Sequence, residues 1–291
     1  MLDTLSTISV DSNFYDLFWK GLFPLITLVI GAIIAIGSQK FLERLERKKT
    51  KKYLIYSLSH LSESIDGQIK NIDTFIKKLE QKPSEIPQLE FNAGFHMKNI
   101  DIISRNDLYN IFVIKKSGKE KENSASLNNF LDYLEILREN INFIETDIIL
   151  LRKKNNDYKE SYNEIYGELI NKINSKFEIY LNQEMPGDLK NADLQKWKIQ
   201  KKLALEIYDL NQLFFKKNAQ YINIFETHDK YLKPLFKLTN QYNDIELSRI
   251  MPKIMLICEE FIFFRDNYIE TFKSINMDLM LVSKNLKNTF A

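Results

Sequence analysis

The side chains best suited to acid–base or metal chemistry are scarce in this chain. Its three histidines are His60, His96 and His228, and none of them has a glutamate three residues earlier. The carboxylate-bridged metal sites of helical bundles need such Glu-x-x-His pairs. We therefore expect neither a metal site nor a bound cofactor.

The one cysteine, Cys258, lies among apolar residues that include Ile257 and Phe261. A single thiol excludes an intramolecular disulfide and any zinc site that needs two thiolates. A cysteine in apolar company is usually a small core residue, so we expect Cys258 to be buried and inert.

Sequence motifs for the common enzymatic reactions are also missing. The chain contains no P-loop, no Gly-x-Gly-x-x-Gly dinucleotide motif, no Gly-x-Ser-x-Gly elbow and no His-Glu-x-x-His zinc motif. We name no catalytic residue and expect a protein that is not an enzyme, although an unfamiliar active site stays open.

A dense run of positive charge follows the most apolar part of the chain. In residues 44–52 its members are Arg44, Arg47, Lys48, Lys49, Lys51 and Lys52. One interpretation is orientation of a membrane span together with contact to anionic headgroups. The other is a specific lipid or nucleic-acid site. Basic and acidic residues nearly balance in the rest of the chain, so we expect no nucleic-acid partner.

An irregular segment, residues 83–103, interrupts the helical patterns with two prolines and one glycine. Its side chains Phe91, Phe95 and His96 form a possible loop for a ligand or a partner, because irregular segments often carry function. The alternative is that both aromatic rings only anchor the segment to the helices.

Residues 21–39 contain no charged side chain. At about 1.5 Å per residue they are long enough to cross the roughly 30 Å core of a bilayer. The expected anchoring residues are Trp19, Pro24, Ile30 and Ile34. A cleaved signal peptide is the alternative, but it would have a basic start, whereas the start here is acidic.

Charge around this apolar stretch predicts its orientation. One lysine precedes it and seven Lys or Arg residues follow it, up to Lys52. Positive charge favours the cytoplasmic side. We expect a single-pass protein of the cell inner membrane, with residues 1–20 outside and the C-terminal region in the cytoplasm.

Small residues within the expected span suggest a contact between copies. Gly31 and Ala35 stand four residues apart, so they share one helix face and would let a second helix approach closely. The alternative is that both simply face lipid.

Apolar residues recur at steps of three and four over most of the remaining chain, which predicts an all-α fold. Residues 40–82 form a basic juxtamembrane segment and a helical stalk, with Gly67 as a weak point. Residues 83–291 form a cytoplasmic bundle of long antiparallel helices.

The first expected helix of the bundle covers 104–116 and begins with a capping pattern at Ser104 and Asp107. Residues 127–180 form one very long helix or two collinear ones, and the polar segment 117–126 before them is a solvated connection. The last two helices cover 191–239, where Pro234 kinks or breaks the end, and 243–285, with a cap near Asn243.

Three functions fit this plan. The first is a membrane-anchored, non-enzymatic assembly protein, including an oligomerising effector in bacterial stress or phage defence. The second is a sensor that binds a small ligand or a peptide through its cytoplasmic helices. The third is an envelope scaffold. The expected partners are the lipid bilayer and a second copy of the chain or another protein.

Overall fold

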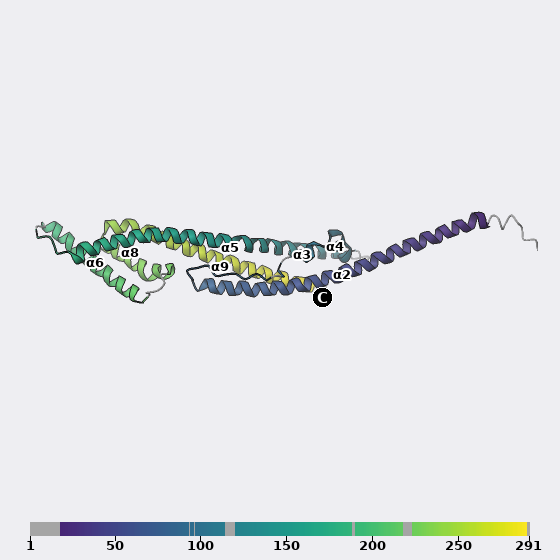
Figure 1. Cartoon of the computed structure of the whole chain (residues 1–291), viewed down its shortest axis with the longest axis horizontal. Coiled ribbons are helices and arrows are strands. Elements are labelled where there is room, and N and C mark those ends of the chain that lie inside the picture. The colour runs from purple at the N-terminus through teal and green to yellow at the C-terminus, as the bar shows by residue number, and fades with distance from the viewer. Residues whose placement is uncertain are drawn as a thin grey trace, which may run out of the picture. The chain divides into compact units, whose positions relative to one another are not determined.

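The computed structural model describes residues 18–92, 94, 95, 97–113, 120–187, 190–217 and 223–289. Every secondary-structure element in these ranges is a helix, which confirms the predicted all-α class (Figure 1). The chain divides into two compact units. Among the described residues, unit 1 comprises residues up to Ser59 together with Lys98–Leu131, and unit 2 comprises His60–Met97 and Asp132–Thr289.

Unit 1 contains a π-helical turn, η1 (Phe18–Leu22), and the first part of α2 (Phe23–Glu80). It also holds two short helices, α3 (Lys98–Asp101) and α4 (Arg105–Phe112), and the start of α5 (Glu120–Phe177). The predicted cap of α4 is confirmed, because the backbone N–H of Asp107 donates to Ser104 Oγ at 3.1 Å.

The start of α5 corrects the expectation of a solvated connection at 117–126. The helix is already formed from Glu120 onward, while residues 114–119 lie outside the described residues. Phe112 stacks on Phe130 with 5.2 Å between ring centroids, and Asn123 Nδ2 donates to the carbonyl of Val113. These contacts tie the polar first turns of α5 to α4, which single-helix periodicity could not reveal.

By length and composition, one described helix, α2, could cross a membrane, and its apolar window near the N-terminus is entirely exposed. A signal sequence and the core helix of a soluble protein pass the same test of length and composition.

In unit 2, the later part of α2 lies alongside α9 (Ile245–Asn288) (Figure 1). The predicted apolar stripe is confirmed: the buried residues include Leu61, Ile65, Ile69, Ile72, Ile76 and Leu79. Phe75 and Phe272 meet edge to face, with ring centroids 5.0 Å apart. Two polar contacts join the same helices farther toward the end of α9, Asn276 Nδ2 to Asp73 Oδ1 and Ser283 Oγ to Asp66 Oδ1, both at 2.6 Å.

Helix α5 continues without a break through the polar run at 153–157 and is followed by a π-helical turn, η2 (Glu178–Asn182). The single long helix was one of the two expected forms. Tyr158 of α5 packs against Phe261 and Phe264 of α9, with ring centroids 5.7 and 5.4 Å apart. Aromatic contacts of this kind hold the two helices together in unit 2.

The third predicted stretch is divided into several elements. They are α6 (Asn191–Lys217), α7 (Ile224–Thr227), the π-helical turn η3 (His228–Leu232) and α8 (Lys233–Gln241). Pro234 is the second residue of α8 and directly follows the π-helical turn η3. The kink or break that was expected at this proline stays a prediction.

The cap of the last helix lies one residue later than predicted. Asp244, not Asn243, is the N-cap of α9, since its Oδ1 accepts from the backbone N–H of Leu247 at 2.9 Å. Asn243 instead has a φ of 51°, a left-handed conformation that asparagine tolerates better than most residues.

Candidate functional site

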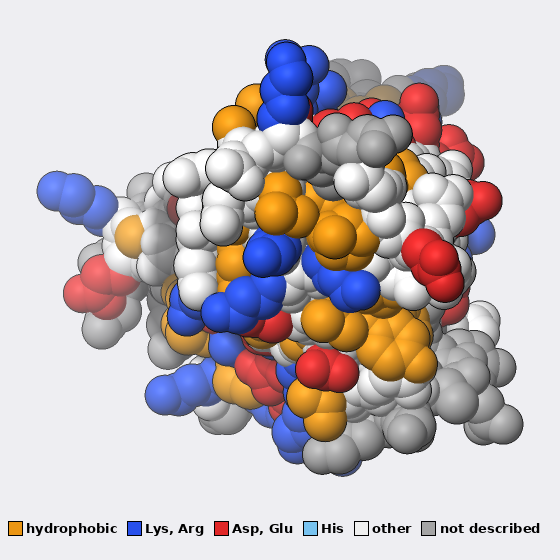
Figure 2. Space-filling view, turned by 90° about the vertical axis from the view of Figure 1, so that its left-hand side faces the viewer, with side chains coloured by type: hydrophobic (Ala, Val, Ile, Leu, Met, Phe, Trp, Pro, Cys, Tyr) orange, Lys and Arg blue, Asp and Glu red, His pale blue; other side chains and the backbone are white. Residues whose placement is uncertain are grey.

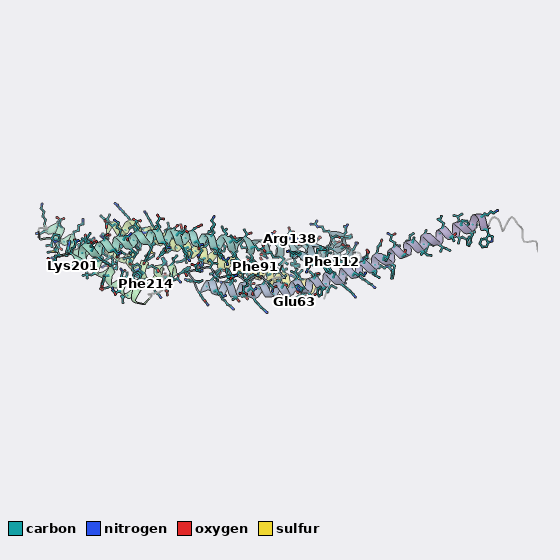
Figure 3. All side chains as sticks on the ribbon, in the orientation of Figure 1. Glu63, Phe91, Phe112, Arg138, Lys201 and Phe214 are labelled. Atoms are coloured by element: carbon teal, nitrogen blue, oxygen red, sulfur yellow. The ribbon has the colours of Figure 1, made fainter. Side chains whose placement is uncertain are left out.

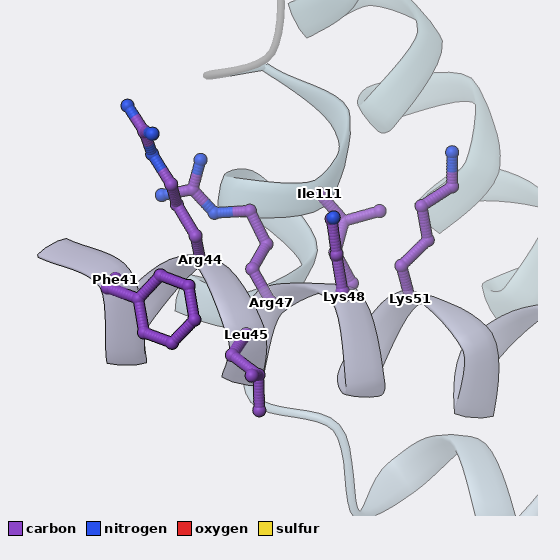
Figure 4. A pocket seen from close by; sticks show the side chains of 7 residues that line it. All are labelled: Phe41, Arg44, Leu45, Arg47, Lys48, Lys51 and Ile111. Carbon is purple, nitrogen blue, oxygen red and sulfur yellow. The ribbon is translucent and has the colours of Figure 1, made fainter.

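Four basic side chains share one face of α2 in unit 1. Arg44, Arg47, Lys48 and Lys51 follow the i, i+3, i+4, i+7 spacing, which brings side chains onto the same side of a helix. Figure 4 shows all four leaving α2 on one side and extending in a similar direction. We call the surface that they line the basic groove.

The basic groove has a volume of about 510 Å³ and apolar side chains in its wall. Phe41 and Leu45 come from α2 itself, and Ile111 comes from α4 (Figure 4). Ile111 is buried, whereas Phe41 is 64% exposed. The groove therefore combines positive charge with an apolar surface that is open to solvent.

Three of the four cations of the basic groove, Arg44, Arg47 and Lys48, are available to a ligand. Within the described part of the chain, Arg44, Arg47 and Lys48 enter no ion pair, and Arg44 and Lys48 are exposed while Arg47 is half-buried. A phosphate oxygen would accept bidentate hydrogen bonds from an arginine and a point-charge contact from a lysine. This donor set fits an anionic headgroup.

Two residues of the predicted basic cluster do not line the basic groove. Lys49 and Lys52 are exposed on α2 but are absent from the lining residues. Sequence spacing could have separated them, because they fall outside the i, i+3, i+4, i+7 set that begins at Arg44. The contribution of Ile111 could not have been foreseen, because it depends on where α4 packs.

The predicted anchoring residues are exposed: Trp19 by 49%, Ile30 by 50% and Ile34 by 64%. Pro24 lies at the second position of α2 and is also exposed. On the expected packing face, a Cβ built at Gly31 would meet nothing within 4 Å, and Ala35 is exposed. A close approach by another helix at these residues is thus sterically open and stays a prediction.

The segment after α2 in unit 2 runs back along the same helix. Asn92 N–H donates to Gln68 Oε1 at 2.9 Å, and Asn71 Nδ2 donates to the carbonyl of Glu90 at 3.0 Å. A Cβ at Gly67 would lie 2.3 Å from Asn92 Nδ2. Gly67 is therefore a place of close approach inside a continuous helix, and the expectation that the helix is weaker there stays a prediction.

The two aromatic rings of this segment have different surroundings. Phe95 is fully buried, as the anchoring interpretation predicts, whereas Phe91 is 42% exposed and can contact a partner (Figure 3). His96 lies outside the described residues. The predicted ligand loop is therefore reduced to one exposed ring on a well-anchored segment.

Tyr162 interacts with Tyr166, Tyr231 and Cys258 in unit 2, and these side chains are further candidates for chemistry among the described residues. The described residues contain no group of three or more His, Cys, Asp or Glu residues that could hold a metal ion. Cys258 is fully buried, and burial raises the pKa of its thiol to about 12, so it is not a thiolate nucleophile at neutral pH. The Tyr162 and Tyr231 hydroxyls are buried, and burial raises the pKa of each phenol.

Charge is mixed on the surface that Figure 2 shows. Lys and Arg side chains are interspersed there with acidic and hydrophobic ones and do not form one broad basic face. An extended basic face is what a sequence-independent nucleic-acid binder needs. This makes the basic groove the clearest concentration of positive charge among the sites described above.

No family model, no curated protein and no solved structure matches the chain.

Sequence analysis missed one residue that the fold places in a cavity, the buried Arg265. The signal was an arginine that directly follows the apolar run Phe261–Phe264 on a helix. A cation in such a position is either buried with partners or turned toward a ligand.

Proposed function

We propose that this chain is a single-pass membrane protein, with its N-terminus outside and a body of long antiparallel helices in the cytoplasm, that acts as a non-enzymatic assembly protein. One observation carries the proposal. The apolar start of α2 is wholly exposed, and the same helix continues directly into the basic groove.

The exposed apolar surface needs a cover. Its large side chains are each at least 40% exposed: Leu22, Phe23, Leu25, Ile26, Leu28, Val29, Ile30, Ile33, Ile34 and Ile36. Burial of one such side chain contributes about 1.5–3 kcal/mol. A contiguous apolar surface of this size marks contact with lipid or with another protein. Lipid fits best because the length of the stretch matches a bilayer core.

The basic groove then lies where headgroups would be. Each basic residue near an anionic leaflet contributes on the order of 1 kcal/mol. We propose that a phosphate of an anionic lipid contacts Arg44, Arg47 and Lys48, while an acyl chain passes Phe41 and Leu45. This contact would fix the cytoplasmic end of the span.

Assembly of copies would use the face of the span that carries Gly31 and Ala35. Small residues let helix backbones approach closely enough for van der Waals contact, which drives association in lipid. The steric freedom at Gly31 supports this part of the proposal.

The test has two parts in cells that express the full chain. A reporter fused after Ala291 is expected to be active only in its cytoplasmic form. Crosslinking in membranes is expected to give dimers or larger species from the natural chain and fewer from Gly31→Leu, with Gly37→Leu as a matched variant off the Gly31/Ala35 face. Periplasmic reporter activity, or monomers alone in every sample, would overturn the proposal.

An effector role in bacterial stress or phage defence would rest on the same assembly. Induction under a phage trigger, followed with a membrane-potential dye, tests it. The natural chain is expected to depolarise the membrane, and Gly31→Leu is expected to abolish this effect. An unchanged membrane potential would contradict the effector role and favour a scaffold.

A further inference from the structure

Arg265 is a buried cation at the centre of unit 2. It lies on α9 and is only 2% exposed. Its Nη1 donates to Asn155 Oδ1 at 2.9 Å, and its Nη2 donates to the carbonyl of Pro83 at 3.3 Å. The guanidinium carbon lies 5.5 Å from the ring centroid of Phe225 and 5.7 Å from that of Phe261. Residues of α5, α7 and α9, together with Pro83 just after α2, therefore surround one positive charge.

All of these partners are neutral. Among the described residues, no carboxylate oxygen lies within 4.0 Å of the guanidinium, and Arg265 Nε has no hydrogen-bond acceptor. Asn155 uses its Oδ1 for Arg265, so its Nδ2 is a second buried donor without an acceptor. A buried cation is costly unless anionic or acceptor groups satisfy it. The carboxylates of Asp266 and Glu85 act on Arg265 without an ion pair at hydrogen-bond distance and raise its pKa, against the effect of burial. The groups that the guanidinium still lacks are oxygen acceptors for its free N–H donor.

Arg265 also lines a cavity of about 390 Å³. This volume is in the range of small-molecule sites. The cavity carries two further cations, Lys82 and Lys273, and an apolar wall of Leu79, Phe225 and Ile269. It therefore offers the mixture of an apolar surface and a few polar groups that orients a ligand.

Glu80 and Glu270, two acidic residues of the cavity, form ion pairs with the same lysine. Lys273 Nζ lies 3.1 Å from Glu80 Oε1 and 3.0 Å from Glu270 Oε1, so it is already paired. Asp266 also lines the cavity. Lys82 Nζ lies over the ring of Phe225 at 5.6 Å from its centroid, without a carboxylate partner among the described residues. Arg265 and Lys82 are thus the cations left for a ligand.

The position of Lys82 is set by its backbone. Its φ is 53°, its N–H donates to the carbonyl of Leu79 at 2.9 Å, and its carbonyl accepts from Asn223 Nδ2 at 2.7 Å. Burial lowers the pKa of Arg265 to about 10, so the guanidinium is still charged at neutral pH. The guanidinium of Arg265 and the backbone of Lys82 are therefore held in place before any ligand arrives, while the Lys82 side chain is exposed.

We propose that this cavity binds a small organic anion, whose carboxylate or phosphate oxygens accept hydrogen bonds from Arg265 and Lys82 while its apolar part packs against Phe225 and Ile269. The site is independent of the proposed membrane function. It would supply the ligand site of a sensor, at a place that the sequence did not indicate.

The experiment titrates purified full-length chain in detergent with succinate and with inorganic phosphate, using calorimetry and thermal unfolding, at constant ionic strength in chloride. Saturable binding and a rise in Tm that grows with ligand concentration are expected for at least one probe. Lys82→Asn removes the charge but suits the left-handed backbone, and it should weaken the apparent Kd about fivefold or more. Lys78→Gln, an exposed lysine one turn earlier and outside the cavity, is the matched control and should bind as the natural chain does.

Arg265→Gln provides a second measurement, with its own Tm recorded first because the residue is buried. If it folds, it should lose the saturable binding. The proposal is overturned if neither probe binds saturably, or if Lys82→Asn and Lys78→Gln bind alike. A general stabilising effect of phosphate would raise the Tm of all variants equally. Such an equal rise would also overturn the proposal.

Discussion

Lys176 and Asp244 form a buried ion pair in unit 2, with 2.6 Å between Lys176 Nζ and Asp244 Oδ2 and exposed fractions of 8% and 3%. The same aspartate caps α9 through its other oxygen, and Lys176 also donates to Gln200 Oε1 at 3.2 Å. The Asp244 carboxylate therefore connects the end of α5 to the start of α9, and the Lys176 ammonium also connects α5 to α6.

Asp244→Ala should destabilise the protein by about 3 kcal/mol, because it leaves the buried Lys176 ammonium with only the more distant carboxylate of Glu246, 3.8 Å away, and removes a helix cap. Asp244→Asn keeps the cap and loses the charge, so it should be less severe. Urea unfolding followed by circular dichroism measures both. Asn243→Gly is the neighbouring control and should cost little, since glycine accepts the left-handed backbone. An equal effect at residues 243 and 244 would contradict the assignment of the cap.

Gly67→Ala should be about 1 kcal/mol less favourable than Gly167→Ala, because its new Cβ meets a side chain, although alanine is the better helix former at both positions. The new Cβ would displace the Asn92 side chain, whose Oδ1 accepts from Gly94 N–H at 3.1 Å. Gly167→Ala is the matched control, because a Cβ there would meet nothing within 4 Å. It should stabilise by about 0.5–1 kcal/mol. Equal shifts of the unfolding midpoint in both variants would contradict the close approach of Asn92 to Gly67.

Acidification should weaken unit 2 through His228. This residue is 3% exposed, and burial, followed by the charge of Lys233, lowers its pKa below the ordinary 6.5, although Asp229 opposes the shift. The unfolded chain then takes up a proton before the folded chain does. The stabilising contribution of neutral His228 is therefore complete above pH 6.5 and is lost as the pH falls through the lower folded pKa. The loss of Tm between pH 7.5 and pH 5 should be smaller in His228→Asn, and an identical loss would exclude this residue as its source.

The basic groove should discriminate between lipids. Native mass spectrometry of the chain in mixed micelles is expected to retain phosphatidylglycerol in preference to phosphatidylcholine. Arg47→Gln with Lys48→Gln should reduce that retention, because both side chains line the groove. The pair Lys49→Gln with Lys52→Gln removes the same charge outside the groove and should retain more lipid. An equal loss of lipid retention in the two double variants would show that net positive charge, and not the groove, determines lipid binding.

The local features of this protein could be predicted from the sequence. The steps of three and four between Leu61 and Leu79 predict which face of α2 is buried, because side chains on one face of a helix share one environment. The cap at Ser104 and the uncharged stretch at 21–39 are equally local. Each depends on residues within one or two turns of one another, so no knowledge of packing is needed.

The two candidate sites were decided by tertiary structure. Ile111 reaches the basic groove from another helix, and Arg265 meets the carbonyl of Pro83, which is 182 residues away in the sequence. Gly67 became a contact only because the following segment turns back along α2. Asp244, the cap of α9, also pairs with Lys176 of α5 through its other oxygen, and this contact joins residues that are far apart in the sequence. Periodicity reports which face of a helix is buried but not which helix covers it, so pairings between distant segments depend on packing.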